Sequence, residues 1–281
     1  MFPGRPSQTM LRTATLRAAH QLLDKPPILH DPIAVGLVPK PSEQAVLATL
    51  DEYLDPVALR LYFALRSRFA EDRLAEAVSR DVCQYVIVGA GLDTFPWRQP
   101  EYARSLQIFA VDHIATLAWT QVRFWEHGLP KPANLTFVPV DLEECRLGEC
   151  LSEFGFDPGT PSFCSVLGVT PYINRRAVDA LLEFAASLKA GSEIVLSFVP
   201  SEDVLQGHNV QIAAGGAKLC AAMGEPWKTR FRLRELVERL TRLGFSEVFH
   251  LTPELAQQRY FSGREDGLRA LGGAQIICAI V

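Results

Sequence analysis

Apolar and polar positions alternate in two different ways along the chain, and the change falls near residue 80. Before it, apolar residues recur at helical spacing over 9–23 and again from about 55 to 78, where Pro56 suits a first helical turn. After it, short apolar runs rich in β-branched residues predict strands separated by helical stretches. These strands are expected at 82–88, 106–111, 135–140, 162–169 and 193–199. Helices are expected at about 114–127, 143–154, 174–189, 203–223 and 231–243.

Strands that alternate with helices are typical of a parallel sheet with helices on both faces. The last two apolar runs, 245–251 and 274–281, have no crossover helix between them, so we expect them to pair antiparallel at the sheet edge. The predicted fold is a Rossmann-like α/β sheet, mostly parallel with an antiparallel last strand. An N-terminal helical cap over 1–80 precedes a core over 81–281. Glycines beside aromatic residues predict a helical lid at about 200–230, with ordinary core helices as the alternative.

Composition narrows the function classes further. The chain has 281 residues and a formal net charge of −4, which gives no electrostatic case for nucleic acid. No apolar run approaches the roughly 18 residues that span a bilayer, and the first residues lack the apolar segment of a secretion signal, so a cytoplasmic location is expected. Six scattered cysteines and six dispersed histidines give no support for a metal site. The oligomeric state stays open.

The first predicted strand ends in a Gly-x-Gly turn, Gly89-Ala90-Gly91. Such a turn lets a ligand approach the backbone closely, because no Cβ stands in the way. The next predicted strand ends in Asp112, and a carboxylate about 20 residues after the turn can accept both hydroxyls of a ribose. The two features together indicate a nucleoside-binding crevice at the carboxyl end of a parallel sheet.

The residues after the turn indicate which nucleoside is bound. A dinucleotide site favours a third glycine, but Thr94 occupies that position and Pro96 delays the next helix. An NAD-dependent oxidoreductase is therefore the least favoured alternative. No Gly-Lys-Ser/Thr follows, which excludes a phosphate-binding P-loop. The pattern favours an adenosine-type ligand without a diphosphate.

Four sequence blocks resemble a known family. The run 86–98, VIVGAGLDTFPWR, is similar to the signature of the leucine carboxyl methyltransferase-like family of class I methyltransferases, and more closely to its bacterial branch of small-molecule O-methyltransferases. The other blocks are 64–72, the strand ends 109–112 and 138–142, and 258–268. The resemblance covers about residues 10 to 281. It implies S-adenosylmethionine as the cofactor and a small organic molecule as the methyl acceptor.

The resemblance also implies roles for individual residues. Arg66 would pair with the methionine carboxylate, and the glycine turn would admit the methionine and ribose portions. Asp112 would bind the ribose diol, Asp141 would accept from the adenine amino group, and the Leu142 backbone would meet the ring. The cofactor-binding residues expected on this basis are Arg66, Gly89, Ala90, Gly91, Asp112, His113, Asp141, Leu142 and Leu167.

Simpler interpretations remain for three of these residues, and one position departs from the family. Arg66 could lie on a solvated helix face, and Asp112 and Asp141 could be helix N-caps. After the fourth strand the family has an acidic residue near the cofactor's amino group, where this chain has Leu167. The amine would then need a backbone carbonyl or Ser165.

The sequence favours a carboxylate as the methyl acceptor, although an acidic hydroxyl stays open. A carboxylate is ionised at pH 7 and needs no general base, whereas a phenol or alcohol does. Catalytic candidates are His113, His208 and Tyr172, and none of them is a convincing base. Candidate substrate-binding residues are Tyr172, His208, Tyr260 and Arg264, although the last two could instead only fasten the last loop. A binding protein that has lost the transfer chemistry and acts as a scaffold is the main alternative.

Overall fold

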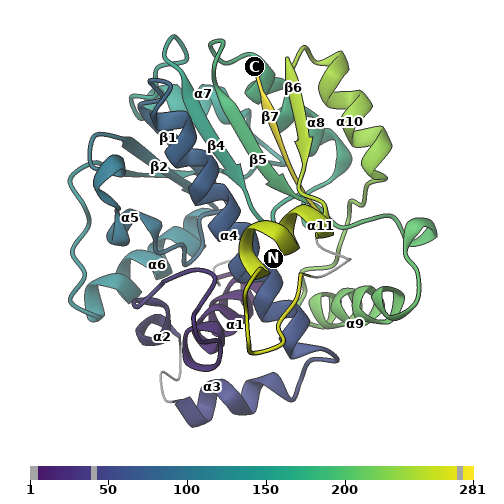
Figure 1. The fold of residues 1–281 in the computed structure, drawn as a ribbon. Helices are drawn as coiled ribbons and strands as arrows, with labels where there is room; N and C mark the ends of the chain where they lie inside the picture. Colours follow the sequence, from purple (N-terminus) through teal and green to yellow (C-terminus); the bar gives the residue numbers. More distant parts are fainter. Residues whose placement is uncertain (1–5, 39–42, 271–274) are drawn as a thin grey trace.

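The computed structural model describes residues 6–38, 43–270 and 275–281. Within these residues seven strands form one sheet in the order β3-β2-β1-β4-β5-β7-β6 (Figure 1). β1 to β5 run parallel, and β7 runs antiparallel to both of its neighbours. This confirms the mostly parallel sheet with an antiparallel last strand. The strands are β1 (Gln84–Val88), β2 (Gln107–Asp112), β3 (Leu135–Pro139), β4 (Ser162–Val166), β5 (Glu193–Ser197), β6 (Glu247–His250) and β7 (Ile276–Ile280).

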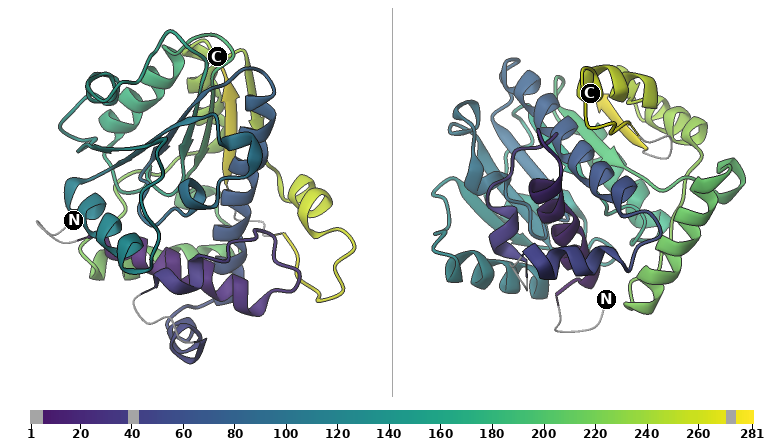
Figure 2. Two further views of the ribbon diagram at one scale, coloured as in Figure 1. Left: turned by 90° about the vertical axis from the view of Figure 1, so that its left-hand side faces the viewer. Right: turned by 60° about the horizontal axis from the view of Figure 1, so that its bottom comes forward.

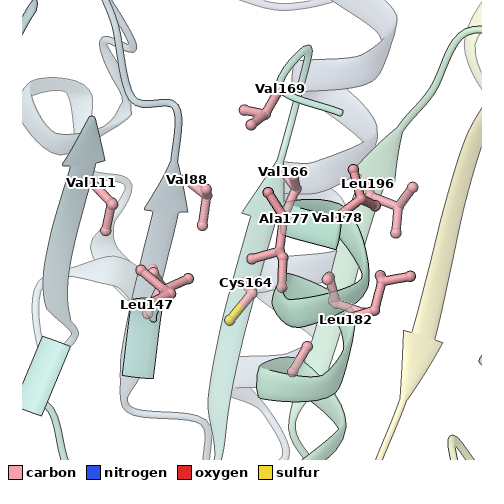
Figure 3. Close-up of a cluster of buried hydrophobic side chains, with 14 of the residues drawn as sticks. Val88, Val111, Leu147, Cys164, Val166, Val169, Ala177, Val178, Leu182 and Leu196 are labelled. Atoms are coloured by element: carbon pink, nitrogen blue, oxygen red, sulfur yellow. The ribbon is translucent and has the colours of Figure 1, made fainter. Parts of the chain in front are cut away.

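The central strands read as continuous apolar runs because both faces of the sheet are covered. All five residues of β1 are buried, and side chains alternate between the two faces along a strand. Tyr85 and Ile87 join the cluster that contains α4 (Pro56–Val78), while Val86 and Val88 join the cluster on the opposite face. Figure 3 shows that opposite face, where Val88, Val111, Cys164, Val166 and Leu196 meet Ala177, Val178 and Leu182.

Helices cover both faces, as the alternating pattern predicts. α4 crosses one face, and α7 (Leu147–Glu153), α8 (Arg175–Ala186) and α10 (Leu233–Arg242) cover the other (Figures 1 and 2). α4 therefore belongs to the layer that packs on the sheet, although the predicted cap contains it. The division at residue 80 stays a prediction.

The other cap helices lie beyond the carboxyl ends of the parallel strands. α1 (Gln8–Leu23) packs against α4 and against two short helices, α2 (Ala34–Leu37) and α3 (Glu43–Leu50). Asp55 caps α4 by accepting from the Ala58 N–H at 2.8 Å, directly before Pro56. The remaining helical elements are α5 (Phe95–Arg98), η1 (Glu101–Ala103), α6 (Ile114–Glu126), η2 (Glu202–Val204), α9 (His208–Ala222), α11 (Pro253–Ala256) and η3 (Gln257–Phe261).

Two predicted helix boundaries differ from the structure. The stretch 203–223 splits into η2 and α9, because Gly207 adopts a left-handed conformation with φ 55° between them. The helix expected from 143 begins only at Leu147. The expected start of the last strand at residue 274, like the chain's first five residues, lies outside the described residues. In the part of the chain that is described, no helix combines the length and apolarity needed to cross a bilayer.

Candidate cofactor site

A cavity of about 570 Å³ opens at the carboxyl ends of the parallel strands, under the first turns of α1. Segments that follow β1, β2, β3 and β4 line it, and this is the edge at which ligands bind in open α/β sheets. All nine residues expected from the sequence to bind the cofactor lie in its wall. The structure therefore brings together residues that are spread over 102 positions of the chain, from Arg66 to Leu167.

The turn after β1 requires glycine at two positions. Gly89 and Gly91 have φ angles of 70° and 48°, and both are closely approached by other side chains. A Cβ at Gly89 would lie 2.3 Å from Cγ2 of Val169, and one at Gly91 would lie 2.8 Å from Cγ of Met10. Conformation and packing thus both exclude larger residues, and the backbone of the turn stays open toward the cavity.

Asp112 ends β2 with its carboxylate directed at the glycine turn. Its Oδ2 accepts from the Gly91 N–H at 2.8 Å, and its Oδ1 accepts from the His113 N–H at 2.7 Å. Burial raises the pKa of Asp112 to about 6, although these two hydrogen bonds act in the opposite direction. The N-cap of α6 is His113, whose Nδ1 accepts from the Ala115 N–H at 3.3 Å. The interpretation of Asp112 as a helix cap is therefore wrong.

Asp141 follows β3 and is exposed at the cavity rim. Its Oδ1 accepts from the Glu143 N–H at 2.9 Å, which closes a local turn. The N-cap of α7 is Arg146, so Asp141 does not cap that helix either. Leu142 lies beside it, partly buried against the core.

Arg66 projects from α4 into the cavity wall and is only 8% exposed. Its Nε has no hydrogen-bond partner, and it forms no ion pair with any described residue. The guanidinium stacks over the Phe63 ring at 4.5 Å and lies beside the backbone of Gly168. Burial lowers the pKa of Arg66. A solvated helix face is excluded for this residue, whereas Arg68 is exposed and pairs with Asp72 at 2.8 Å.

A buried network supports the turn from the side of the cap. The Thr94 hydroxyl donates to Asp31 at 2.7 Å and accepts from Arg17 and Arg98, each at 2.9 Å. Arg17 also donates to the Leu92 carbonyl at 3.3 Å. Burial alone would raise the pKa of Asp31, but the charges of the two arginines outweigh it and lower the pKa. Thr94, at the third-glycine position, thus joins the turn to the cap and does not face a phosphate.

The comparisons with known proteins agree with this geometry. The model of the leucine carboxyl methyltransferase family matches residues 10–186. The chain belongs to the leucine carboxyl methyltransferase family. This confirms the resemblance, the enzyme class and S-adenosylmethionine as the cofactor.

Relatives and solved structures extend the match over the whole chain. The methyltransferase is 30% identical to YktD of Bacillus subtilis, which is named as an S-adenosyl-L-methionine-dependent methyltransferase. The match covers 100% of this chain and 99% of YktD. A Mycobacterium avium protein with the same designation is 27% identical over 92% of this chain and 79% of its own length. A Thermobifida fusca methyltransferase structure gives a TM-score of 0.62 at 14% identity over 99% and 96% of the two chains, and supports the fold.

Three of the predicted substrate-binding residues do not line the cavity of the methyltransferase. His208 begins α9, is 56% exposed, and places its Nε2 3.3 Å from Oδ2 of Asp55. The Tyr260 hydroxyl donates to Asp72 at 2.9 Å, and Arg264 pairs with Asp266. These assignments are corrected: the first residue lies on an exposed helix, and the other two line a separate hollow.

Tyr172 does line the cavity, at the start of the segment that leads to α8. Its hydroxyl lies 3.5 Å from Sγ of Cys220, which joins it to the last turns of α9. Burial raises the pKa of Tyr172 well above its usual value, so the phenol stays protonated at neutral pH.

Glu225 is a cavity residue that sequence analysis missed. It is buried, and its carboxylate accepts from the Ser7 hydroxyl at 2.8 Å, the Gln8 N–H at 2.7 Å and the Thr9 hydroxyl at 2.5 Å. A carboxylate from the segment after α9 thereby binds the first turn of α1, where a negative charge is favoured. Nothing in the local pattern around residue 225 signals this contact, because its partners lie more than 200 residues away.

Proposed function

We propose that this methyltransferase transfers the methyl group of S-adenosylmethionine to an oxygen of a small organic molecule, with a carboxylate as the preferred acceptor. The observation that carries the proposal is the order of groups along the carboxyl edge of the sheet. Strand order β3-β2-β1-β4 aligns Asp141 and Leu142, then Asp112, then the glycine turn, then Gly168 with Arg66, at strand spacings of about 4.8 Å. Adenine, ribose, the methionyl chain and its carboxylate follow one another in the same order.

Arg66 supports this direction of binding. A buried guanidinium without an anionic partner is costly, and a ligand carboxylate would satisfy its free donors with charge-assisted hydrogen bonds. A second cavity residue, Arg17, bears on the same region, since its charge contributes to lowering the pKa of Arg66. Arg17 is itself paired with Asp31, so the guanidinium of Arg66 is the cation in this part of the wall that is left for an anionic group of the ligand.

The cofactor's ammonium has no carboxylate from β4 to meet, because Leu167 occupies that position. Ser165 lines the cavity next to it, and its hydroxyl is paired with the buried Tyr85 hydroxyl at 2.9 Å. The Ser165 oxygen and backbone carbonyls of the turn are the acceptors we assign to the ammonium.

The three catalytic candidates support an acceptor that is ionised before it binds. Nδ1 of His113 already accepts a backbone hydrogen bond, so the neutral ring carries its proton on Nε2 and has no free acceptor. Tyr172 stays protonated because burial raises its pKa, and His208 lies outside the cavity. A carboxylate with a pKa near 4 needs no base.

The chain's own contribution is then binding and alignment. The bound cofactor supplies an electrophilic methyl group on a sulfonium. The cavity wall would hold the acceptor oxygen against the methyl group and exclude water, and proximity of this kind contributes strongly to rate. Phe63 and Met10 provide apolar wall surface for the acceptor. Residues 200–230 act as the lid in this proposal, since Glu225, Pro226 and Lys228 line the cavity.

The proposal is tested by incubating the protein with S-adenosylmethionine labelled at the methyl group and a panel of small carboxylic acids and phenols. Methyl esters are expected, and mild alkali will release their label as volatile methanol. Arg66→Met should abolish turnover at low cofactor concentration, whereas Arg68→Met, two residues along the same helix, should not. Label that survives alkali as a methyl ether would overturn the carboxylate preference, and no transfer to any acceptor by folded, cofactor-bound protein would overturn the proposal.

A further inference from the structure

A second hollow, of about 420 Å³, lies outside the cofactor cavity and shares none of its lining residues. Three segments form it: residues 25–28 after α1, α4 at Arg68, and residues 259–266 after α11. In Figure 1 the last of these segments passes in front of α4, and in the left view of Figure 2 it projects from the side of the molecule. This segment belongs to the block 258–268 that the cofactor site leaves unused.

The charge of the second hollow is opposite to that of the protein. Its wall carries four basic and two acidic side chains, an excess of two positive charges in a chain whose net charge is −4. The side chains of Lys25 and Arg259 are exposed and form no ion pair or hydrogen bond with any described residue. The six charged residues of the wall are Lys25, Arg68, Arg259, Arg264, Glu265 and Asp266.

The other two cations are held in fixed positions. Arg68 pairs with Asp72 at 2.8 Å, donates to the Ile28 carbonyl at 3.2 Å and lies over the Tyr260 ring at 5.9 Å. Arg264 has a side chain only 7% exposed, and its Nε donates to Oδ1 of Asp266 at 3.0 Å while Nη2 pairs with Oδ2. Its Nη1 has no partner among the described residues. Ordered guanidinium groups lose little freedom when they bind a ligand.

The π-helical turn η3 brings these groups together. It carries Arg259 and Tyr260 and leads directly into Gly263, whose left-handed φ of 71° turns the chain back toward α4. Such turns are rare in proteins and occur often at functional sites. The turn places Arg259 and Arg264, from one short segment, around the same hollow as Lys25 from the cap.

We propose that the second hollow binds a phosphate-type dianion, either free phosphate or the phosphate group of a small molecule. Two unpaired cations match the two negative charges of such a group, and guanidinium groups supply paired donors to its oxygens. A monocarboxylate carries one negative charge fewer and would be attracted less strongly by the two cations. The acidic residues nearby form no ion pair with Lys25 or Arg259: Asp266 pairs with Arg264, Asp72 interacts with Arg68 and Tyr260, and Glu265 forms no ion pair with any described residue.

Calorimetric titration of the full chain tests the site, with S-adenosylhomocysteine at saturation so that the arginines of the cofactor cavity are occupied. The probes are inorganic phosphate, phenyl phosphate and acetate, with sodium chloride keeping the ionic strength constant. One saturable phosphate site is expected, with acetate binding at least about 10-fold more weakly. Tighter binding of phenyl phosphate than of inorganic phosphate would identify an organic phosphate as the occupant, and the reverse order would identify free phosphate.

Two double variants with the same loss of charge separate the site from general electrostatics. Lys25→Ala with Arg259→Ala should weaken phosphate binding by about 10-fold or more. Arg234→Ala with Arg242→Ala, on the exposed face of α10, should leave it unchanged. S-adenosylhomocysteine should bind equally well to the two double variants, and urea unfolding should show that both variants are folded. Phosphate binding that does not saturate, or that falls equally in the two double variants, would overturn the proposal.

Discussion

Replacing Arg66 with methionine should weaken cofactor binding strongly while leaving the stability of the cofactor-free protein nearly unchanged or slightly higher. The structure gives this side chain an unpartnered Nε, no ion pair with a described residue, and a position in the cavity wall. A hydrogen bond to a charged group contributes about 1.5–3 kcal/mol, so the loss of a bidentate pair with the ligand carboxylate removes at least about 3 kcal/mol. That corresponds to a rise of roughly 150-fold in the Kd of S-adenosylhomocysteine.

Stability should respond differently because no counterion is lost from the cofactor-free protein. The substitution removes a buried, uncompensated charge, which is favourable, and a cation–π contact with Phe63 worth about 1–2 kcal/mol. Methionine retains apolar contact with the same ring. The free energy of unfolding of the cofactor-free protein is therefore expected to stay within about 1 kcal/mol of the original, or to rise.

Isothermal titration calorimetry at pH 8 and urea unfolding measure the two quantities on the same preparations. Arg68→Met is the matched control, because Arg68 lies on the same helix but is 45% exposed and paired with Asp72. It should change affinity little and stability by less than about 1 kcal/mol. If Arg66→Met unfolds far more readily while its affinity is unchanged, Arg66 is a packing residue and the assigned direction of cofactor binding is wrong.

Three further predictions concern the turn and its supports. Because burial raises the pKa of Asp112 to about 6, the ionised carboxylate that accepts the ribose hydroxyls is lost below that pH. Affinity for S-adenosylhomocysteine should therefore fall as pH drops from 7 to 5, and Asp112→Asn should bind weakly without this pH dependence; a flat profile for the original protein would contradict the assignment. Asp31→Asn leaves two buried arginines without their shared carboxylate and should lower the free energy of unfolding by about 3 kcal/mol in urea, whereas a loss below about 1 kcal/mol would show that the network contributes little. Gly168→Ala would place a Cβ 2.7 Å from Nη1 of Arg66 and should reduce the affinity for S-adenosylhomocysteine, measured by calorimetry, about 10-fold. The control Gly191→Ala has a similar positive φ but open space around it, so it should lower the free energy of unfolding by only about 1–2 kcal/mol and leave affinity unchanged.

The strands and the glycine turn could be predicted because they depend on local pattern. A strand buried on both faces is a continuous apolar run, so the local sequence predicts β1. A left-handed turn that faces a ligand requires glycine, so Gly89 and Gly91 can also be identified without tertiary information. Asp112 could be identified in the same way, because it ends the apolar run of the next strand. Leu167 could also be identified as a departure from the family before any geometry was known.

The hydrogen bonds and ion pairs that hold the glycine turn in place could not be predicted, since they join segments far apart in the chain. Arg17, Asp31 and Thr94 are separated by up to 77 residues, and only packing of the cap against the turn brings them into contact. His208 is a substrate-binding candidate in the sequence, but it begins α9 directly after Gly207, and α9 lies on the surface. Where a helix has few buried side chains, its apolar pattern gives little information on where it docks.

The most direct test of the central claim is the structure of the complex with S-adenosylhomocysteine, in which the ligand's contacts with Arg66 and Asp112 are measured. We expect a ligand carboxylate within about 3.2 Å of the Arg66 guanidinium and ribose hydroxyls within the same distance of the Asp112 carboxylate, with adenine toward Leu142. A ligand bound in the reverse direction, with adenine beside Arg66, or bound outside this cavity, would contradict it.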